Sequence, residues 1–302
     1  ALTGRSPWSV TYTDGTTPVT VTGIAANPYT FTTSPVISTT WIVTIVTDAN
    51  NCSNTGTGNA TVTVNNVTPG VVAGDQTICF NGDPSPFTST TPGSGDGTFS
   101  YRWEISTGGP WTAITGANGA TYDAPGPLSL STQYRRTAVS TLNGVTCSSS
   151  SNILSITVQS VTTGGISANQ TICNGSTPTR IISSPDGTGT PGAVITYSWE
   201  YSVNGGATYS PAPGNPTTAY YDPPALTQTT LYHRRTVSTL NGVSCNSGWT
   251  NAVVITVQTV PTAGQIGSNQ TICNNSTPAQ LTSVTNGGGS TGATITYLWE
   301  QS

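Results

Sequence analysis

Six cysteines are the residues of this sequence whose type and spacing most directly suggest chemistry. None belongs to a Cys-x-x-Cys pair, and His233 is the sole histidine, so the ligand pattern of a zinc site is missing. Widely spaced cysteines are typical of disulfides, which persist in oxidising compartments. The sequence therefore predicts disulfides, no metal site and an extracellular location.

Two pairing schemes follow from the order of the cysteines. The preferred scheme gives one bond to each complete repeat unit, Cys79–Cys147 and Cys173–Cys245, and leaves Cys52 and Cys273 to pair outside the 302 residues. The alternative joins successive cysteines: Cys52–Cys79, Cys147–Cys173 and Cys245–Cys273. A strand of about nine residues after Cys147 would span about 30 Å, whereas bonded cysteines have Cα atoms within about 7 Å, and this favours the first scheme.

No arrangement of residues typical of an enzyme is found. Residues 288–292 match the Gly-x-Ser-x-Gly string of serine hydrolases, but they lie in a glycine-rich loop of a segment without a histidine. A phosphate-binding loop of the Walker type needs a lysine, which the sequence lacks. His233 falls on a predicted strand and is expected to face solvent. We expect no enzymatic activity and no cofactor.

The sequence has three glutamates, and each occupies the same position in its own repeat: Glu104, Glu200 and Glu300. Each follows the tryptophan of a predicted strand, so it should point away from the core. The strand expected alongside carries paired arginines, and the candidate partners are Arg135 or Arg136, and Arg234 or Arg235. The pattern predicts a cross-strand ion pair, which would be worth less than about 1 kcal/mol at an exposed site.

Trp111 and Trp249 lie outside the repeated positions. If exposed, they could stack on sugar rings, although core packing is the more common fate of tryptophan. These two residues are the basis for an alternative hypothesis, an array of carbohydrate-binding modules.

Three sequence markers recur in the same order at a spacing of about a hundred residues. The markers are Gln-Thr-Ile-Cys ending at Cys79, Cys173 and Cys273; Tyr-x-Trp-Glu with its tryptophan at Trp103, Trp199 and Trp299; and Leu-Asn-Gly-Val-x-Cys ending at Cys147 and Cys245. A period of this length matches an immunoglobulin-sized sandwich and exceeds that of helical solenoid repeats.

Alternating apolar residues predict the strands that must position these markers. Residues 99–105 and 195–201 each alternate about a central tryptophan, and residues 154–158 and 253–257 alternate near the end of each repeat. A tyrosine begins the penultimate strand. The predicted core residues are Trp103, Trp199, Trp299, Tyr134 and Tyr232.

Composition supports an all-β fold. Only 6% of residues are charged, and the sequence is rich in Thr, Ser, Gly, Asn and Pro, which suits strands and turns and cannot support long helices. A formal net charge of −4 without a basic patch gives no electrostatic basis for nucleic-acid binding. No apolar run reaches the ~18 residues of a membrane span.

The repeats predict tandem modules with short linkers in an elongated array. We expect complete modules at 68–161 and 162–261, the C-terminal part of a module at 1–67, and the N-terminal part of another at 262–302. The sequence is interpreted as a window on a longer array. An alternative is that the two partial modules complete each other between neighbouring molecules.

The strings Asn-Gln-Thr-Ile-Cys-Asn-Gly-Ser-Thr-Pro at 169–178, Tyr-x-Trp-Glu, Tyr-His-Arg-Arg at 232–235 and Asn-Gly-Val-x-Cys resemble the PKD-like and Ig-like repeats of very large surface proteins of Bacteroidetes-type bacteria, gliding adhesins among them. The resemblance covers both complete modules and residues 263–302. It implies export, often by the type IX route, and attachment to the cell surface of a Gram-negative bacterium. It implies no catalytic residues.

These observations predict a structural role, as the stalk or fibre of an extracellular adhesin or filament. The expected partners are neighbouring modules or other copies of the protein, associated laterally or head-to-tail, and surface glycans under the alternative hypothesis. Nucleic acid and a membrane span are not expected.

Overall fold

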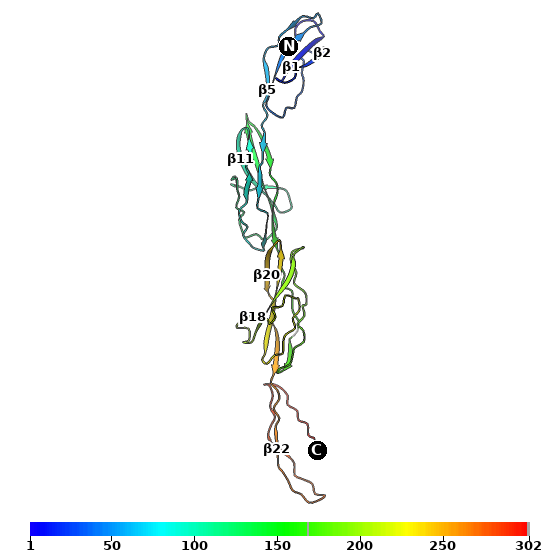
Figure 1. Ribbon diagram of the computed structural model, residues 1–302, viewed down its shortest axis with the longest axis vertical. Helices are drawn as coiled ribbons and strands as arrows, with labels where there is room; N and C mark the ends of the chain where they lie inside the picture. Colours follow the sequence, from blue (N-terminus) through cyan, green and yellow to red (C-terminus); the bar gives the residue numbers. More distant parts are fainter. Residues whose placement is uncertain (168, 301–302) are drawn as a thin grey trace. The chain divides into compact units, whose positions relative to one another are not determined.

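The computed structural model describes residues 1–167 and 169–300, and all of its regular elements within those residues are β-strands (Figure 1). No helix long and apolar enough to cross a membrane occurs in this described part. Contacts divide the chain into two compact units. The first unit comprises Ala1–Gln76, Asp83–Gly126 and Leu130–Ile156, and the second comprises Thr77–Gly82, Pro127–Ser129 and the described part of 157–302.

The N-terminal residues form one sheet in the strand order β2-β1-β3-β4, with β5 also paired to β3. Its strands are β1 (Trp8–Thr13), β2 (Val19–Ile24), β3 (Thr39–Thr47), β4 (Ser53–Asn54) and β5 (Asn59–Val62). One face buries Trp8, Val10 and Ile24, because alternate residues of a strand point to the same side.

The first complete repeat is built on a six-stranded sheet in the order β12-β11-β13-β15-β8, with β14 also paired to β13. Its strands are β8 (Gln76–Cys79), β11 (Thr98–Ser106), β12 (Thr112–Ala113), β13 (Thr132–Leu142), β14 (Val145–Ser150) and β15 (Leu154–Gln159). The other layer consists of the pairs β6–β10 and β7–β9. These strands are β6 (Val67–Thr68), β7 (Val71–Ala73), β9 (Thr88–Thr91) and β10 (Ser94–Gly95).

Aromatic rings fill the space between the two layers. Phe87, which bridges to Tyr122, stacks on Trp103 at 5.7 Å between ring centroids and contacts Tyr134 at 5.0 Å. Trp103 and Tyr134 are 0% and 1% exposed.

The second complete repeat has the same plan, with the sheet order β16-β21-β19-β17-β18 and β20 paired to β19. Its strands are β16 (Gln170–Cys173), β17 (Val194–Ser202), β18 (Ser210–Pro211), β19 (Thr230–Leu240), β20 (Val243–Trp249) and β21 (Val253–Gln258). Trp199 and Tyr232 are each 1% exposed in its core, where both contact Tyr221.

In both repeats the first segment of chain serves both layers. Its first part pairs with the second strand in the smaller layer, as β7 does with β9. Its later part lies beside the last strand of the larger sheet, as β8 does beside β15. In the second repeat this pairing of β16 with β21 is parallel. A first strand shared between two facing sheets, with a tryptophan-bearing strand in the larger sheet, is the arrangement of an immunoglobulin-like sandwich. The chain is therefore all-β and contains tandem immunoglobulin-like modules.

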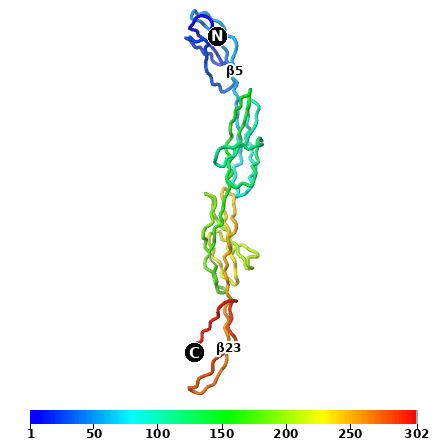
Figure 2. Tube along the Cα trace, turned by 180° about the vertical axis from the view of Figure 1, so that it is seen from behind, coloured from blue at the N-terminus to red at the C-terminus, as the bar shows by residue number. Residues whose placement is uncertain are grey.

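Residues 262–300 contain one pair of strands, β22 (Gln265–Gly267) and β23 (Thr282–Thr285). In Figure 2 this orange and red part of the chain, which includes β23, turns back on itself. Trp299 is 58% exposed, which differs from its predicted place in a core. No second sheet covers it among the described residues of this segment.

Candidate functional site

A disulfide joins Cys79 to Cys245, with 5.5 Å between their Cα atoms. Cys79 is the last residue of β8 and Cys245 lies in β20, so the bond links the first of the two complete repeats to the second. The predicted pairs Cys79–Cys147 and Cys173–Cys245 are not formed, and neither is any pair of the alternative scheme. Cys52, Cys147, Cys173 and Cys273 are free.

The direction of the first strand explains why the within-module pairing is wrong. β8 ends beside the end of β15, where the amide of Phe80 donates to the carbonyl of Gln159 at 3.0 Å. Cys147 is paired with Ser140 next to the β13–β14 turn, at the start of the long return to Gln159. Because residues 147–159 cover roughly 30–40 Å when extended, the two cysteines of one repeat lie at opposite ends of its sheet.

Gln159 is buried against the β19–β20 hairpin of the second repeat, with an exposed fraction of 0%. Its Nε2 donates to the carbonyl of Val243 at 3.0 Å and contacts Sγ of Cys245 at 3.2 Å. Its Oε1 accepts from the hydroxyl of Ser238 at 3.2 Å. Both ends of this buried amide are therefore satisfied, as burial of a polar group requires.

The turn of the same hairpin makes a further contact with the first repeat. Asn241 and Gly242 have φ values of 50° and 78°, which is the geometry that an Asn-Gly turn provides between antiparallel strands. From this turn the Nδ2 of Asn241 donates to Oγ1 of Thr77 at 2.9 Å. The turn, the buried amide and the disulfide together make up what we call the junction.

The same amide contacts occur in the first unit. Asn65 donates through Nδ2 to the carbonyls of Ser140 and Val145 at 2.8 and 3.0 Å, and its Oδ1 accepts from the Ser140 hydroxyl at 2.6 Å. Ser140 and Val145 are the counterparts of Ser238 and Val243. Cys147 stands where Cys245 stands in the second repeat, so the amide contacts of the junction are repeated along the chain.

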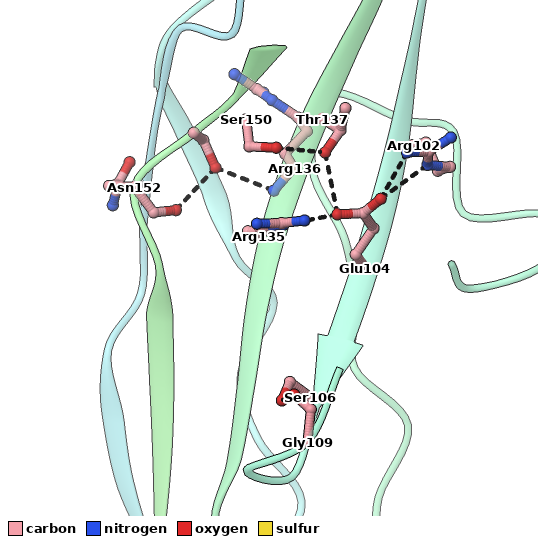
Figure 3. A network of polar contacts seen from close by, with 10 residues as sticks. Arg102, Glu104, Ser106, Gly109, Arg135, Arg136, Thr137, Ser150 and Asn152 are labelled. Atoms are coloured by element: carbon pink, nitrogen blue, oxygen red, sulfur yellow. Dashed lines mark hydrogen bonds and ion pairs between the residues drawn. The ribbon is translucent and has the colours of Figure 1, made fainter. Parts of the chain in front are cut away.

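The predicted cross-strand ion pair is confirmed for Glu104, with Arg135 as the partner (Figure 3). Glu104 is 6% exposed, and its carboxylate accepts from Arg135 and Arg102, each at 2.6 Å, and from the hydroxyl of Thr137 at 3.2 Å. Burial acts to raise the pKa of Glu104, but the hydrogen bonds and charges of Arg135 and Arg102 outweigh it and hold the pKa below its ordinary value.

In the second repeat the partner of the glutamate is His233 and not an arginine. Its Nε2 lies 3.0 Å from Oε2 of Glu200. The prediction of a solvent-facing histidine is wrong, because His233 is 8% exposed and stacks between aromatic rings, 3.8 Å from Tyr209 and 4.1 Å from Trp249 between centroids.

The two tryptophans considered for sugar stacking already have side chains against their rings. The guanidinium of Arg135 lies 4.4 Å from the centroid of Trp111. Trp249 is stacked on His233 and has the guanidinium of Arg235 at 4.8 Å. A sugar ring needs a free aromatic face, and these contacts reduce the aromatic surface that either tryptophan offers to a sugar.

Sequence reasoning left open which arginine of each pair faces the core. Arg136 is 0% exposed, and its guanidinium lies 4.2 Å from the ring centroid of Tyr101 while donating to the Ala120 carbonyl at 2.6 Å and the Pro69 carbonyl at 3.0 Å. Burial lowers its pKa. Arg234 has the matching place over Tyr197. The sequence does contain a signal that distinguishes the two arginines. Arg136 is two residues after the core residue Tyr134, so strand alternation places both on the same face of β13.

The described residues contain no group of three or more His, Cys, Asp or Glu side chains that could hold a metal ion.

Comparison with solved structures finds many chains of low similarity. The three N-terminal domains of the bacteriophage RB49 highly immunogenic outer capsid protein are 10% identical, with 85% of this chain and 89% of that chain covered and a TM-score of 0.38. A marsupial T cell receptor is 12% identical, with 68% and 79% covered and a TM-score of 0.38. Domains A168–A170 of titin are 11% identical, with 73% and 75% covered and a TM-score of 0.34. At these values the similarity carries nothing about function.

No curated protein matches the sequence. A family profile described as "Domain of unknown function (DUF8696)" matches residues 68–160 and again residues 162–259. These two matches cover more than half of the 302 residues. The chain therefore belongs to this family, of which it contains two tandem copies.

Proposed function

We propose that this chain is a structural repeat region of an extracellular adhesin or filament, in which it acts as a stalk or fibre that carries tension along the modules. The observation that supports the proposal most is the disulfide between Cys79 and Cys245, because it ties one module covalently to the next. Disulfides persist outside the cytoplasm, which supports an extracellular place. We also propose that the protein is exported by the type IX route and lies on the cell surface of a Gram-negative bacterium.

The position of the bond determines how tension would pass. The two cysteines are 166 residues apart in sequence. Force that reaches Cys79 from the N-terminal side can cross the bond directly to Cys245, so the residues between them bear none of it. These intervening residues contain the first module from β9 to β15 and the second module up to β20. The junction would thus keep the array from lengthening when a module loses its fold.

Single-molecule pulling on the 302-residue chain tests this role. In the oxidised chain, residues 80–244 should not contribute to the final extended length. Reduction of the disulfide should add roughly 550–600 Å, at 3.3–3.6 Å for each of the 166 residues. Cys52→Ser is the matched control, because Cys52 is free, and it should leave both lengths unchanged. Equal final lengths before and after reduction would remove the mechanical proposal.

The location is tested separately with antibodies against the two repeats on intact, unpermeabilised cells of the source organism. Gold labels on the outer surface, along threads or fibres, are the expected result. Label that appears only after the cells are opened would contradict a surface stalk, whatever the pulling experiment shows.

We propose that the partners are neighbouring modules and other copies of the protein. Low charge supports lateral association, since 6% charged residues leave few of the edge charges that normally keep sheets apart. A monodisperse monomer in sedimentation at millimolar concentration would contradict lateral association.

A further inference from the structure

Four of the cysteines fall into two structural positions that recur in both complete repeats. The first position is the end of the first strand, occupied by Cys79 in β8 and Cys173 in β16. The second is the hairpin that follows the penultimate strand, occupied by Cys147 in β14 and Cys245 in β20. The observed bond joins a first-position cysteine to the second-position cysteine of the next repeat.

The backbone around Cys173 repeats the backbone around Cys79. The residue after each cysteine donates its amide to the glutamine that ends the last strand: Phe80 to Gln159 at 3.0 Å, and Asn174 to Gln258 at 2.8 Å. Each cysteine carbonyl also accepts from the amide three residues later, at 2.8 Å for Cys79 and 3.0 Å for Cys173. The thiol of Cys173 is therefore held at the same end of its sheet as Cys79, and it is exposed.

The surroundings of Cys147 repeat those of Cys245. Cys147 is paired with Ser140 in the same register as Cys245 with Ser238. The hairpin of Cys147 also already holds the equivalent amide of the preceding repeat, because the partly buried Asn65 bonds to Ser140 and Val145. The amide contacts to the serine and valine of the hairpin that accompany the observed disulfide are thus also present beside Cys147.

We propose that Cys147 and Cys173 each form this same inter-module disulfide, so that one bond crosses every junction of the array. The partner of Cys147 is a first-strand cysteine of the preceding module, in a Gln-Thr-Ile-Cys string. The partner of Cys173 is a hairpin cysteine of the following module, in an Asn-Gly-Val-x-Cys string. This inference rests on one part of the proposed function, namely that further modules flank the chain.

The chemistry is a two-electron oxidation at each junction. Two thiols lose two protons and two electrons as the sulfur–sulfur bond forms. A disulfide of an extracytoplasmic thiol oxidoreductase accepts them and is reduced to a pair of thiols. At the observed junction the hydrogen bonds of the amide and the turn hold the two segments that carry the bonded cysteines side by side, and we expect the same arrangement at the proposed junctions.

Peptide mapping without reduction tests the proposal on the protein secreted by its source organism. Free thiols are first blocked with iodoacetamide, and the protein is then digested with chymotrypsin, because cleavage after aromatic residues and leucine leaves both strings intact and separates Cys147 from Cys173 at Leu154. The Cys173 peptide should be cross-linked to a peptide with the hairpin string, and the Cys147 peptide to one with the first-strand string. The Cys79–Cys245 cross-link in the same digest is the internal control.

Several outcomes would overturn the inference. One is alkylation of Cys147 or Cys173 by iodoacetamide in the unreduced protein, which would show a free thiol. Another is a disulfide between Cys147 and Cys173. A third is a disulfide that joins two hairpin cysteines or two first-strand cysteines. Each would leave the pulling result on the Cys79–Cys245 bond intact, so failure here is distinguishable from failure of the proposed function.

The partner thiol can belong to the same polypeptide or to another molecule, and a gel distinguishes the two sources. Cross-links within one polypeptide leave a single band whose mass is unaffected by reduction. Cross-links between molecules give a ladder that collapses on reduction, and Cys173→Ser should shorten that ladder while preserving the Cys79–Cys245 peptide. Both patterns agree with the proposal when the mapped pairs have the stated strings.

Discussion

Gln159 and Asn65 have equivalent places in successive repeats and differ by one methylene group. Each amide donates to the main chain of the following hairpin and accepts from a serine hydroxyl, Ser238 or Ser140. A buried amide with both ends bonded fixes one orientation of the two segments, because any displacement leaves a polar group unsatisfied. An apolar residue at this place would allow more than one packing.

Replacement of Gln159 by alanine should lower the free energy of unfolding by about 1–3 kcal/mol, since the Val243 carbonyl and the Ser238 hydroxyl lose their partner. Urea denaturation followed by tryptophan fluorescence measures the loss. Gln258→Ala is the matched control, because Gln258 ends β21 as Gln159 ends β15 but is exposed. Its effect should stay within about 0.5 kcal/mol. Equal losses in the two variants would contradict a specific role for the buried amide.

Glu104 predicts a pH dependence of stability. Its pKa in the folded chain is lowered from 4.5, so its contribution is fully present above the unfolded pKa and is lost as pH falls through the folded pKa. At pH 7, Glu104→Gln should cost about 1.5–3 kcal/mol, the worth of hydrogen bonds to a charged group. The difference in Tm from the unmodified chain should shrink below pH 4.5. Glu300→Gln, at an exposed site, should leave Tm unchanged at every pH, and a constant difference for Glu104→Gln would contradict the assignment.

At the scale of elements, the inward-facing arginine of the penultimate strand connects the two layers of each module. From β13, Arg136 reaches the hydroxyl of Ser89 in β9 and the carbonyl of Pro69 next to β7, and its guanidinium lies over Tyr101 of β11. The planar guanidinium of arginine has several N–H donors in fixed directions, so it can make these three contacts at once. The ammonium group of a lysine cannot. The layers are thus joined by a polar clamp as well as by the aromatic core.

Arg136→Lys should destabilise the first module by about 3–5 kcal/mol, the usual result of disrupting a buried charged network. Arg135→Lys, on the opposite face of the same strand and 27% exposed, should cost less than about 1 kcal/mol. Thermal unfolding of both variants measures the difference. A similar cost for the two lysine variants would show that the buried guanidinium does not connect the layers.

The elements that the sequence predicted well are those with local signals. The strand around Trp103 and the tyrosine of the penultimate strand are visible as alternation over a few residues. The outward Glu104 opposite Arg135 follows from the same alternation.

The disulfide pairing could not be predicted in this way because it depends on two non-local facts. One is that the first strand lies beside the last strand and ends where that strand ends, at Gln159, which places Cys79 at the far end of its module. The other is that the hairpin of the next repeat packs against Gln159 at that end. His233 was misplaced for a related reason, since its aromatic neighbours Tyr209 and Trp249 come from a loop and from the following strand.

At the scale of the whole molecule, the disulfide restricts the unfolded chain. Closing a loop of 166 residues is worth about 5 kcal/mol on the chain-entropy account. Because the loop encloses most of both modules, reduction should lower the unfolding temperature of both, which Cys79→Ser should reproduce and Cys52→Ser should not. Scanning calorimetry with and without reductant measures the shift. An unfolding temperature that is insensitive to reductant in the unmodified chain would contradict the expected stabilisation.

The central claim is that the covalent link runs between modules and not within them. Mass spectrometry of the unreduced 302-residue chain, folded under oxidising conditions and digested with thermolysin, tests it most directly. The account predicts a peptide pair that contains Cys79 and Cys245. Peptide pairs that join Cys79 to Cys147 and Cys173 to Cys245 would contradict it, because each module would then be closed on itself and no bond would cross the junction.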